Sequence, residues 1–383
     1  MSTTASSLTL GPRRCRAIAG VTAEYLSGGA NSRFENDDGP RGGEDDDAED
    51  LAPSTHGFVA GTAVLGGDND LLTLQYQEEE KKLSQIESRS HPAGEIWELA
   101  PHPKERFLVS CWASAEGREI SVATKDYMVD RIAGGEGARM AAFDNKNAGQ
   151  QFASVHEDGS TKFWHFQEGE VAPVVGAVVK SDAAFKGCKD IAWDPNSPGV
   201  VITATGGNFA RILDSREAKE ATRIDTLTRC LTVDANPNRP HFFLTGGEDG
   251  IVKFWDSRKA DEPVQQLREG HQHWVTKARY NPFHDQLVIS SSTDGTVCLW
   301  RAASVSSAPL LDMESDDEDQ AAQHPETRKQ QQDALVKSFD DNLDSVYGIA
   351  WSAVNAWVYA SLSYDGKAVI HTVPAGEKYK ILL

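Results

Sequence analysis

The chain has 383 residues, and its 38 basic and 58 acidic side chains give a formal net charge of −20. This length allows two average domains or one large β or α/β domain, with a core that needs no disulfide or metal to hold it. The excess of acid argues against a nucleic-acid-binding or anionic-membrane-binding surface, because both need clustered Lys and Arg. The five cysteines are widely spaced without a C-x-x-C pair, which disfavours a disulfide framework or zinc site and favours a reducing compartment.

The amino-terminal segment does not have the pattern of a targeting sequence. Residues 1–19 contain three arginines but no apolar region ahead of a cleavage site. The longest strongly apolar uncharged run, residues 171–179, is far shorter than the roughly 20 residues that span a bilayer. We therefore expect a cytoplasmic protein without direct membrane insertion, which reaches a membrane only through a partner.

Two acidic segments differ in composition from the rest of the chain. Residues 27–55 carry nine acids against two arginines, and residues 309–333 carry eight acids against two bases. Because neither segment has clustered aromatic or β-branched residues, neither can offset its ordering entropy by burial, and we expect both to be disordered insertions. They are either solubilising insertions, or a docking site for a basic partner or a phospho-regulated segment around Ser315.

A repeat of about 45 residues organises the remainder. Its mark is an Asp-Gly turn followed by alternating apolar residues, which is typical of a hairpin turn that leads into a strand. The aspartates are spaced by 91 residues, by 45, and by 71, where the last interval is one period plus the second acidic segment; they are Asp158, Asp249, Asp294 and Asp365.

A second pattern lies upstream of each Asp-Gly turn. A short apolar strand ends in a turn rich in Pro or Asn, as in residues 191–198, and another strand then leads into the Asp-Gly turn. A weaker fourth strand follows, as in residues 334–339. Four strands per period of about 45 residues indicate a WD40-type blade, so the predicted fold is all-β, a seven-bladed WD40 β-propeller over residues 13–383. The seven third strands are expected near 70–76, 119–124, 161–166, 208–214, 251–256, 296–301 and 367–372.

The two ends of the chain must close the ring, because an open blade would expose a sheet edge. The first strand of blade 1 is expected near residues 16–23, and the first acidic segment interrupts that blade before Phe58. Residues 378–383 are expected to supply the outer strand of the last blade. Whether residues 8–10 add a further closing pair is left open by the sequence.

Several polar residues resemble a catalytic triad but recur once per blade. A His, a Ser or Thr, an Asp and a Trp at these spacings form, in WD40 blades, a buried hydrogen-bond network that rigidifies the blade. We therefore predict a structural role for the following set: His271, Ser290, Asp294 and Trp300; Thr245, Asp249 and Trp255; Ser154, Asp158 and Trp164; Ser361 and Asp365, with His371 at the Trp position.

No pattern indicates an enzyme, a metal or a cofactor. His271 and His273 are two apart with no third ligand nearby, and the glycines of residues 204–208 precede no helix that would bind a phosphate. The acidic runs lack the spacing of a calcium loop. We expect no catalytic residue, no metal site and no cofactor.

The carboxy-terminal third resembles a known family. Residues 252–295 and 344–370, followed by YKILL at 379–383, are similar to the eukaryotic WD-repeat proteins that interact with the EARP and GARP tethering complexes, and the segment EIWELAPHP from Glu95 also fits. The resemblance implies a monomeric, non-catalytic scaffold that binds tethering-complex subunits. It further implies location at the trans-Golgi network and endosomes through partners, with roles in endosomal recycling and endosome-to-Golgi transport.

The alternative function is a chromatin-associated WD40 protein that binds basic histone tails through the acidic segments. Propellers of that type usually add a long amino-terminal helix, and residues 1–30 show no amphipathic helical pattern. A propeller enzyme or a ubiquitin-ligase substrate receptor has no positive signal.

The partner-binding residues are expected where each first strand begins. Aligning the blades places four residues at equivalent positions on one face: Trp274, Arg229, Glu95 and Ser345. A Trp beside an Arg has the composition of a binding hot spot, although Trp274 could instead pack on the neighbouring blade.

Overall fold

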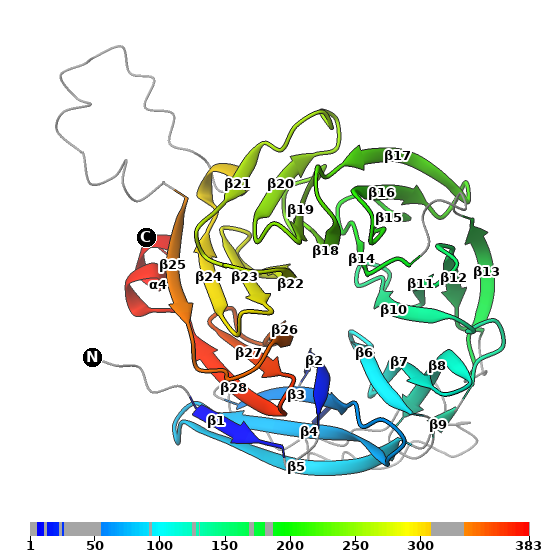
Figure 1. The fold of residues 1–383 in the computed structure, drawn as a ribbon, viewed down its shortest axis with the longest axis horizontal. Coiled ribbons are helices and arrows are strands. Elements are labelled where there is room, and N and C mark those ends of the chain that lie inside the picture. The colour runs from blue at the N-terminus through cyan, green and yellow to red at the C-terminus, as the bar shows by residue number, and fades with distance from the viewer. Residues whose placement is uncertain are drawn as a thin grey trace, which may run out of the picture.

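Seven four-stranded antiparallel sheets stand around a central axis in the computed structural model (Figure 1). The structure describes residues 6–10, 14–22, 25–26, 55–91, 94–124, 128–129, 131–167, 172–180, 187–307 and 333–382. The seven-bladed β-propeller is confirmed, and each predicted third strand coincides with a strand of the structure. Most of the two acidic segments, 27–54 and 308–332, lies outside the described residues.

Each blade is one sheet whose strands follow one another from the axis outward. Blade 1 comprises β2 (Cys15–Val21), β3 (Thr55–Thr62), β4 (Asn69–Gln77) and β5 (Lys82–His91). Blade 2 comprises β6 (Glu95–Pro101), β7 (Phe107–Ser114), β8 (Gly117–Thr124) and β9 (Met128–Val129). Blade 3 comprises β10 (Ala138–Phe143), β11 (Gln151–His156), β12 (Thr161–His165) and β13 (Val174–Val179). Blade 4 comprises β14 (Asp190–Trp193), β15 (Val200–Ala204), β16 (Phe209–Asp214) and β17 (Lys219–Asp225).

The remaining blades follow the same plan until the last. Blade 5 comprises β18 (Cys230–Ala235), β19 (Phe242–Gly247), β20 (Val252–Asp256) and β21 (Gln265–Leu267). Blade 6 comprises β22 (Val275–Tyr280), β23 (Leu287–Ser292), β24 (Val297–Arg301) and β25 (Ala334–Phe339), with the short 3-10 turn η1 (Ala303–Val305) after β24. Blade 7 comprises β26 (Val346–Trp351), β27 (Val358–Ser363), β28 (Lys367–Thr372) and, as its outer strand, β1 (Ser6–Thr9).

The Asp-Gly turns have the geometry that their sequence requires. In blade 6, Gly295 adopts φ +85°, a left-handed conformation that favours glycine, and the Asp294 carboxylate accepts a hydrogen bond from the Thr296 amide at 2.8 Å. In blade 3, Gly159 adopts φ +82° and Asp158 accepts from the Ser160 amide at 2.8 Å. The repeated dipeptide therefore fixes the turn between the second and third strands.

The core lies within and between blades. Strands such as β23 and β27 are buried on both faces, because each sheet packs on a blade at either side. One core cluster joins Leu244 and Phe254 of blade 5 to Val288 and Trp300 of blade 6, and another joins Phe107 of blade 2 to blade 3. Burial on two sides explains why these strands have almost continuous apolar sequences.

The ring closes at its amino terminus. β1 pairs with β28 in antiparallel register, Ser7 opposite Val369, and Leu8 packs on a core cluster shared by blades 1 and 7. The first sheet residue, Ser6, thus precedes residue 13, at which the propeller was expected to begin.

The expected outer strand at residues 378–383 is wrong. The described part of this segment belongs to the helix α4 (Ala375–Leu382), which begins with the Glu377 amide donating to the Pro374 carbonyl at 2.9 Å. The Glu377 carboxylate forms a buried ion pair with Arg301 at 2.8 Å, which holds the helix against blade 6. Since β1 already occupies the edge of β28, no strand position remains there for this segment.

The indole rings of Trp255 and Trp300 test the blade assignment. Both are buried, and replacing either with Ala is expected to lower the free energy of unfolding by about 3–5 kcal/mol, as for large aromatic side chains in cores. The matched control is Trp274→Ala, since Trp274 is 41% exposed and loses little packing. Urea denaturation of the three variants measures their free energies of unfolding. Equal free energies for all three would contradict the assignment of Trp255 and Trp300 to the blade cores.

Candidate functional site

The polar residues of blade 6 form a hydrogen-bonded chain inside the blade. Trp300 Nε1 donates to the Ser290 hydroxyl at 2.7 Å, and that hydroxyl is 2.6 Å from His271 Nε2. His271 Nδ1 is 2.8 Å from the Thr296 hydroxyl, which donates to Asp294. Burial lowers the pKa of His271 to about 4, so the imidazole is neutral at physiological pH. A buried neutral His with both nitrogens engaged ties strands together.

Blades 3 and 5 repeat the same contact. Trp164 Nε1 donates to the Ser154 hydroxyl at 2.8 Å, and Trp255 Nε1 donates to the Thr245 hydroxyl at 2.9 Å. Asp249 accepts from the Thr228 hydroxyl at 3.0 Å in the loop before β18. Each chain lies in its own blade, so these residues do not converge on one centre.

Blade 7 uses a His in place of the Trp. The Ser361 hydroxyl is 2.8 Å from His371 Nε2, and the His371 ring stacks on Tyr359 with ring centroids 5.1 Å apart. Asp365 accepts from the Ser363 hydroxyl within its Asp-Gly turn. The contact between the second and third strands is thus kept with a smaller ring.

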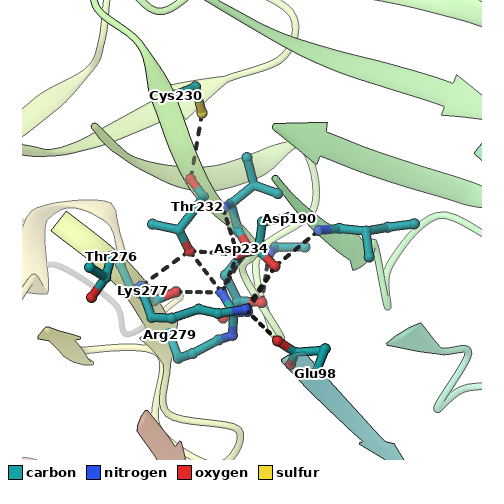
Figure 2. A network of polar contacts seen from close by, with 12 residues as sticks. Glu98, Asp190, Cys230, Thr232, Asp234, Thr276, Lys277 and Arg279 are labelled. Carbon is teal, nitrogen blue, oxygen red and sulfur yellow. Dashed lines mark hydrogen bonds and ion pairs between the residues drawn. The ribbon is translucent and has the colours of Figure 1, made fainter. Parts of the chain in front are cut away.

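A cluster of charged side chains, among them Glu98, Asp190 and Arg279, joins strands of different blades (Figure 2). Asp190, at the start of β14, receives two hydrogen bonds from the Arg279 guanidinium of β22, at 2.9 and 3.0 Å. Lys277 of the same strand lies 3.2 Å from Asp190 and 3.1 Å from Glu98 of β6. Blade 6 is therefore linked by ion pairs to blades 4 and 2, which are not its neighbours; we call Glu98, Asp190, Lys277 and Arg279 the axial cluster.

Charge and burial oppose each other in this cluster. Burial would raise the pKa of Asp190, but Arg279 and Lys277 outweigh it and hold that pKa well below its usual range. Burial raises the pKa of Glu98, against the attraction of Lys277. Burial likewise raises the pKa of Asp234, which accepts from the Tyr280 amide at 2.8 Å, to about 6. Asp190 is thus the ionised anchor of the cluster.

A hollow of about 270 Å³ lies at one end of the axis, on the face where the innermost strands begin; we call it the channel mouth and the face the mouth face. A second hollow of about 280 Å³ lies along β2, β6, β22 and β26. Four residues line both hollows, which therefore adjoin there: Arg16, Glu98, Lys277 and Tyr347. Residues from all seven blades line the channel mouth: Arg16, Trp97, Glu98, Arg118, Arg139, Met140, Cys188, Lys189, Leu231, Trp274, Thr276, Lys277, Thr293 and Tyr347.

The four residues predicted to bind a partner lie at this end of their blades, but they differ in surroundings. Trp274 is exposed, lines the channel mouth and stacks on the ring of His273 at 5.3 Å. The Arg229 side chain is 50% exposed and forms an ion pair with Glu248 at 3.0 Å. Glu95 accepts from Trp97 Nε1 at 3.2 Å, and the Ser345 hydroxyl donates to the Thr293 carbonyl. Of the four, only Trp274 lines the hollow.

The axial cluster and the cations of the channel mouth were missed from the sequence. A signal was present in the innermost strand Val275–Tyr280, whose six residues include the two cations Lys277 and Arg279. Because a buried charge is costly unless it is paired, charged residues on the innermost strand of one blade imply oppositely charged residues on other blades. The partners Glu98 and Asp190 are 179 and 87 residues from Lys277, and no local pattern connects them.

The described residues show neither a metal-binding cluster nor a membrane-spanning helix. Within them, no three His, Cys, Asp or Glu side chains are placed to hold a metal ion together. Across the same ranges, no helix has the length and apolar character to cross a bilayer. All five cysteines are buried and none of them forms a disulfide, and burial raises the pKa of Cys188 and of Cys298 to about 11.

Comparison with known proteins gives one family. Residues 47–300 match the family model described as the EIPR1 beta-propeller. The "EARP and GARP complex-interacting protein 1" of Homo sapiens is 30% identical over 364 residues, which cover 85% of this chain and 92% of that protein. The "EARP-interacting protein 1" of Caenorhabditis elegans is 28% identical with the same coverage. The "WD repeat-containing protein DWA2" of Arabidopsis thaliana is 29% identical over 82% of this chain and 89% of that protein.

Asp190→Asn tests the axial cluster. The loss of a charge from a buried, hydrogen-bonded ion pair is expected to lower the free energy of unfolding by about 3–5 kcal/mol near neutral pH. Because the pKa of Asp190 is lowered in the folded state, its stabilisation is present above the unfolded value of about 3.9 and is lost as pH falls below it. The stability gap between wild type and variant should therefore narrow below about pH 4.

Urea denaturation across this pH range measures the gap. Asp261→Asn, at an exposed position, serves as the matched control and should change stability little at any pH. An Asp190→Asn variant as stable as this control would contradict the role assigned to the cluster.

Proposed function

The chain belongs to the EIPR1 β-propeller family, and on that premise we propose that it is a non-catalytic interaction scaffold for vesicle-tethering complexes of the EARP and GARP type. The names of the human and nematode relatives support this, because the first describes interaction with EARP and GARP and the second interaction with EARP. The separate, buried hydrogen-bond chains of the blades support a non-catalytic role, since each serves its own sheet.

The observation that carries the proposal is the exposed Trp274 at the rim of the channel mouth. Aromatic residues beside Arg are enriched where protein interfaces have their strongest contacts. The exposed apolar residues Leu227 and Leu343 lie in the loops before β18 and β26, which also belong to the mouth face. We therefore place the tether-binding surface on the mouth face.

The finer role follows from the same premise. A cytoplasmic, monomeric propeller that binds such tethers would be located at endosomes and the trans-Golgi network through its partners. There it would promote recruitment of the tethers in endosomal recycling and endosome-to-Golgi transport. Binding of basic histone tails is not favoured, because the channel mouth itself is lined by Arg and Lys side chains.

Affinity purification with mass spectrometry tests the proposal. Wild-type protein is expected to capture tethering-complex subunits. Capture by the double variant Trp274→Ala with Arg229→Ala should fall at least about tenfold, which corresponds to a loss of about 1.4 kcal/mol in binding free energy. The matched control is Phe283→Ala with Lys146→Ala, because these exposed residues lie in loops after β22 and β10 on the opposite face.

Thermal melts of both double variants accompany the capture. The melting temperature should barely change, because none of the four side chains is buried. Wild-type protein that captures no tether subunit would contradict the proposed function. Normal capture by the Trp274 and Arg229 variant would contradict the assignment of the mouth face.

A further inference from the structure

Five cations line the channel mouth of a protein whose net charge is −20. Three of them have carboxylate partners in the structure: Lys277 pairs with Glu98, while Arg118 and Arg139 share Glu157 at 2.8 and 3.2 Å. Arg16 and Lys189 form no ion pair with any carboxylate of the described residues. The residues that line the channel mouth therefore carry more positive charge than the carboxylates beside them neutralise.

Lys189 shows this excess most directly. The residue is half-buried just ahead of the axial Asp190, and its pKa is lowered, first by burial and then by four cations around it: Arg139, Arg229, Arg118 and Arg16. An ammonium group that loses hydration and faces only like charges is destabilised. An anion bound at this position would relieve both costs.

Two aromatic rings position the Arg16 side chain in the channel mouth. Its guanidinium carbon lies 3.9 Å from the ring centroid of Trp97 and 4.3 Å from that of Tyr347. Arg118 lies 4.0 Å from the same Trp97 ring. Stacking fixes a guanidinium in place, so less side-chain entropy is lost when it binds a carboxylate.

The channel mouth is not only cationic. Met140 and Leu231 lie in its wall, and Trp274 lies at its rim with 41% of its surface exposed. A ligand that fits this lining has acidic groups for the cations and an apolar group for Trp274. The geometry points to an acidic peptide segment of a partner protein, carrying one large apolar side chain, as the ligand of the channel mouth; this inference rests on the proposed function.

A peptide fits better than a small phosphorylated ligand. The cations are spread over blades 1, 2, 3, 4 and 6, and the carboxylate of Glu98 lies among them. A compact phosphate group prefers several donors that converge on one point, whereas an extended chain places its carboxylates along a line. The apolar lining would contribute nothing to a phosphate.

The two acidic segments of this chain are joined to the propeller at the face opposite to the channel mouth. The first lies between β2 and β3, and the second between β24 and β25. Both connections start and end on the face opposite to the channel mouth, where β2 and β24 end. We therefore take the ligand to be a segment of a partner protein.

The test uses purified full-length protein and a fluorescein-labelled peptide of Asp and Glu residues around a central Leu. Fluorescence anisotropy is expected to show binding that weakens as salt rises, since the contacts are between charges. Lys189→Gln should weaken binding about threefold or more, and Lys189→Glu about tenfold or more. Lys146→Glu, on the opposite face, is the matched control and should bind as wild type does.

Each outcome decides the inference. Weakening in both Lys189 variants with unchanged melting temperature and an intact control supports it. No binding to wild type, or equal binding by wild type and Lys189→Glu, overturns it. Tight binding of inositol hexaphosphate that Lys189→Glu abolishes, without peptide binding, also overturns it and assigns a phosphate site. If the peptide binds but no tether subunit is captured, the peptide site is supported and the proposed function is refuted. If tether subunits are captured but the peptide does not bind, only the peptide site is refuted.

Discussion

Closure of the ring by one short strand is the constraint on which the rest of the structure depends. β1 contributes the outer strand of blade 7, so the first sheet residues of the chain complete its last sheet. Without that pairing the edge of β28 would be open, and blades 1 and 7 would lose the contact of Leu8 with their shared core. The channel mouth is lined by all seven blades, from Arg16 in blade 1 to Tyr347 in blade 7. The site therefore exists only in the closed ring.

The axial cluster links three blades of that ring, blades 2, 4 and 6, by ion pairs. Lys277 and Arg279 extend from a single strand and pair with Asp190 and Glu98 on blades that are not neighbours of blade 6. A buried ion pair contributes little net stability compared with apolar packing, but it strongly disfavours arrangements that leave one charge unpaired. In this propeller two of its members, Glu98 and Lys277, lie where the two hollows of the axis adjoin. Arg16 and Lys189, which also line the channel mouth, are then left to face solvent or a ligand.

The repeat could be predicted from the sequence because each of its turns is determined by a few consecutive residues. An Asp-Gly pair followed by alternating apolar residues sets a hairpin whatever the rest of the chain does, and so the blades, their third strands and the Trp–Ser contacts follow from short segments. The carboxy terminus was misread because YKILL has strand-like residues, whereas the Glu377–Arg301 ion pair and the occupied edge of β28 favour a helix. The axial cluster joins residues 87 and 179 positions apart, and the channel mouth gathers single residues from seven blades. Such non-local sites need the fold before they can be recognised.

A photo-crosslinking amino acid placed at single positions tests most directly whether the mouth face is the surface that binds the tether. Benzoylphenylalanine would replace Trp274 on that face and, in a separate protein, the exposed Phe283 on the opposite face. The account predicts that irradiation of the captured complex links position 274, and not position 283, to a tethering-complex subunit. Crosslinks from position 283 alone, with the complex still captured, would contradict it.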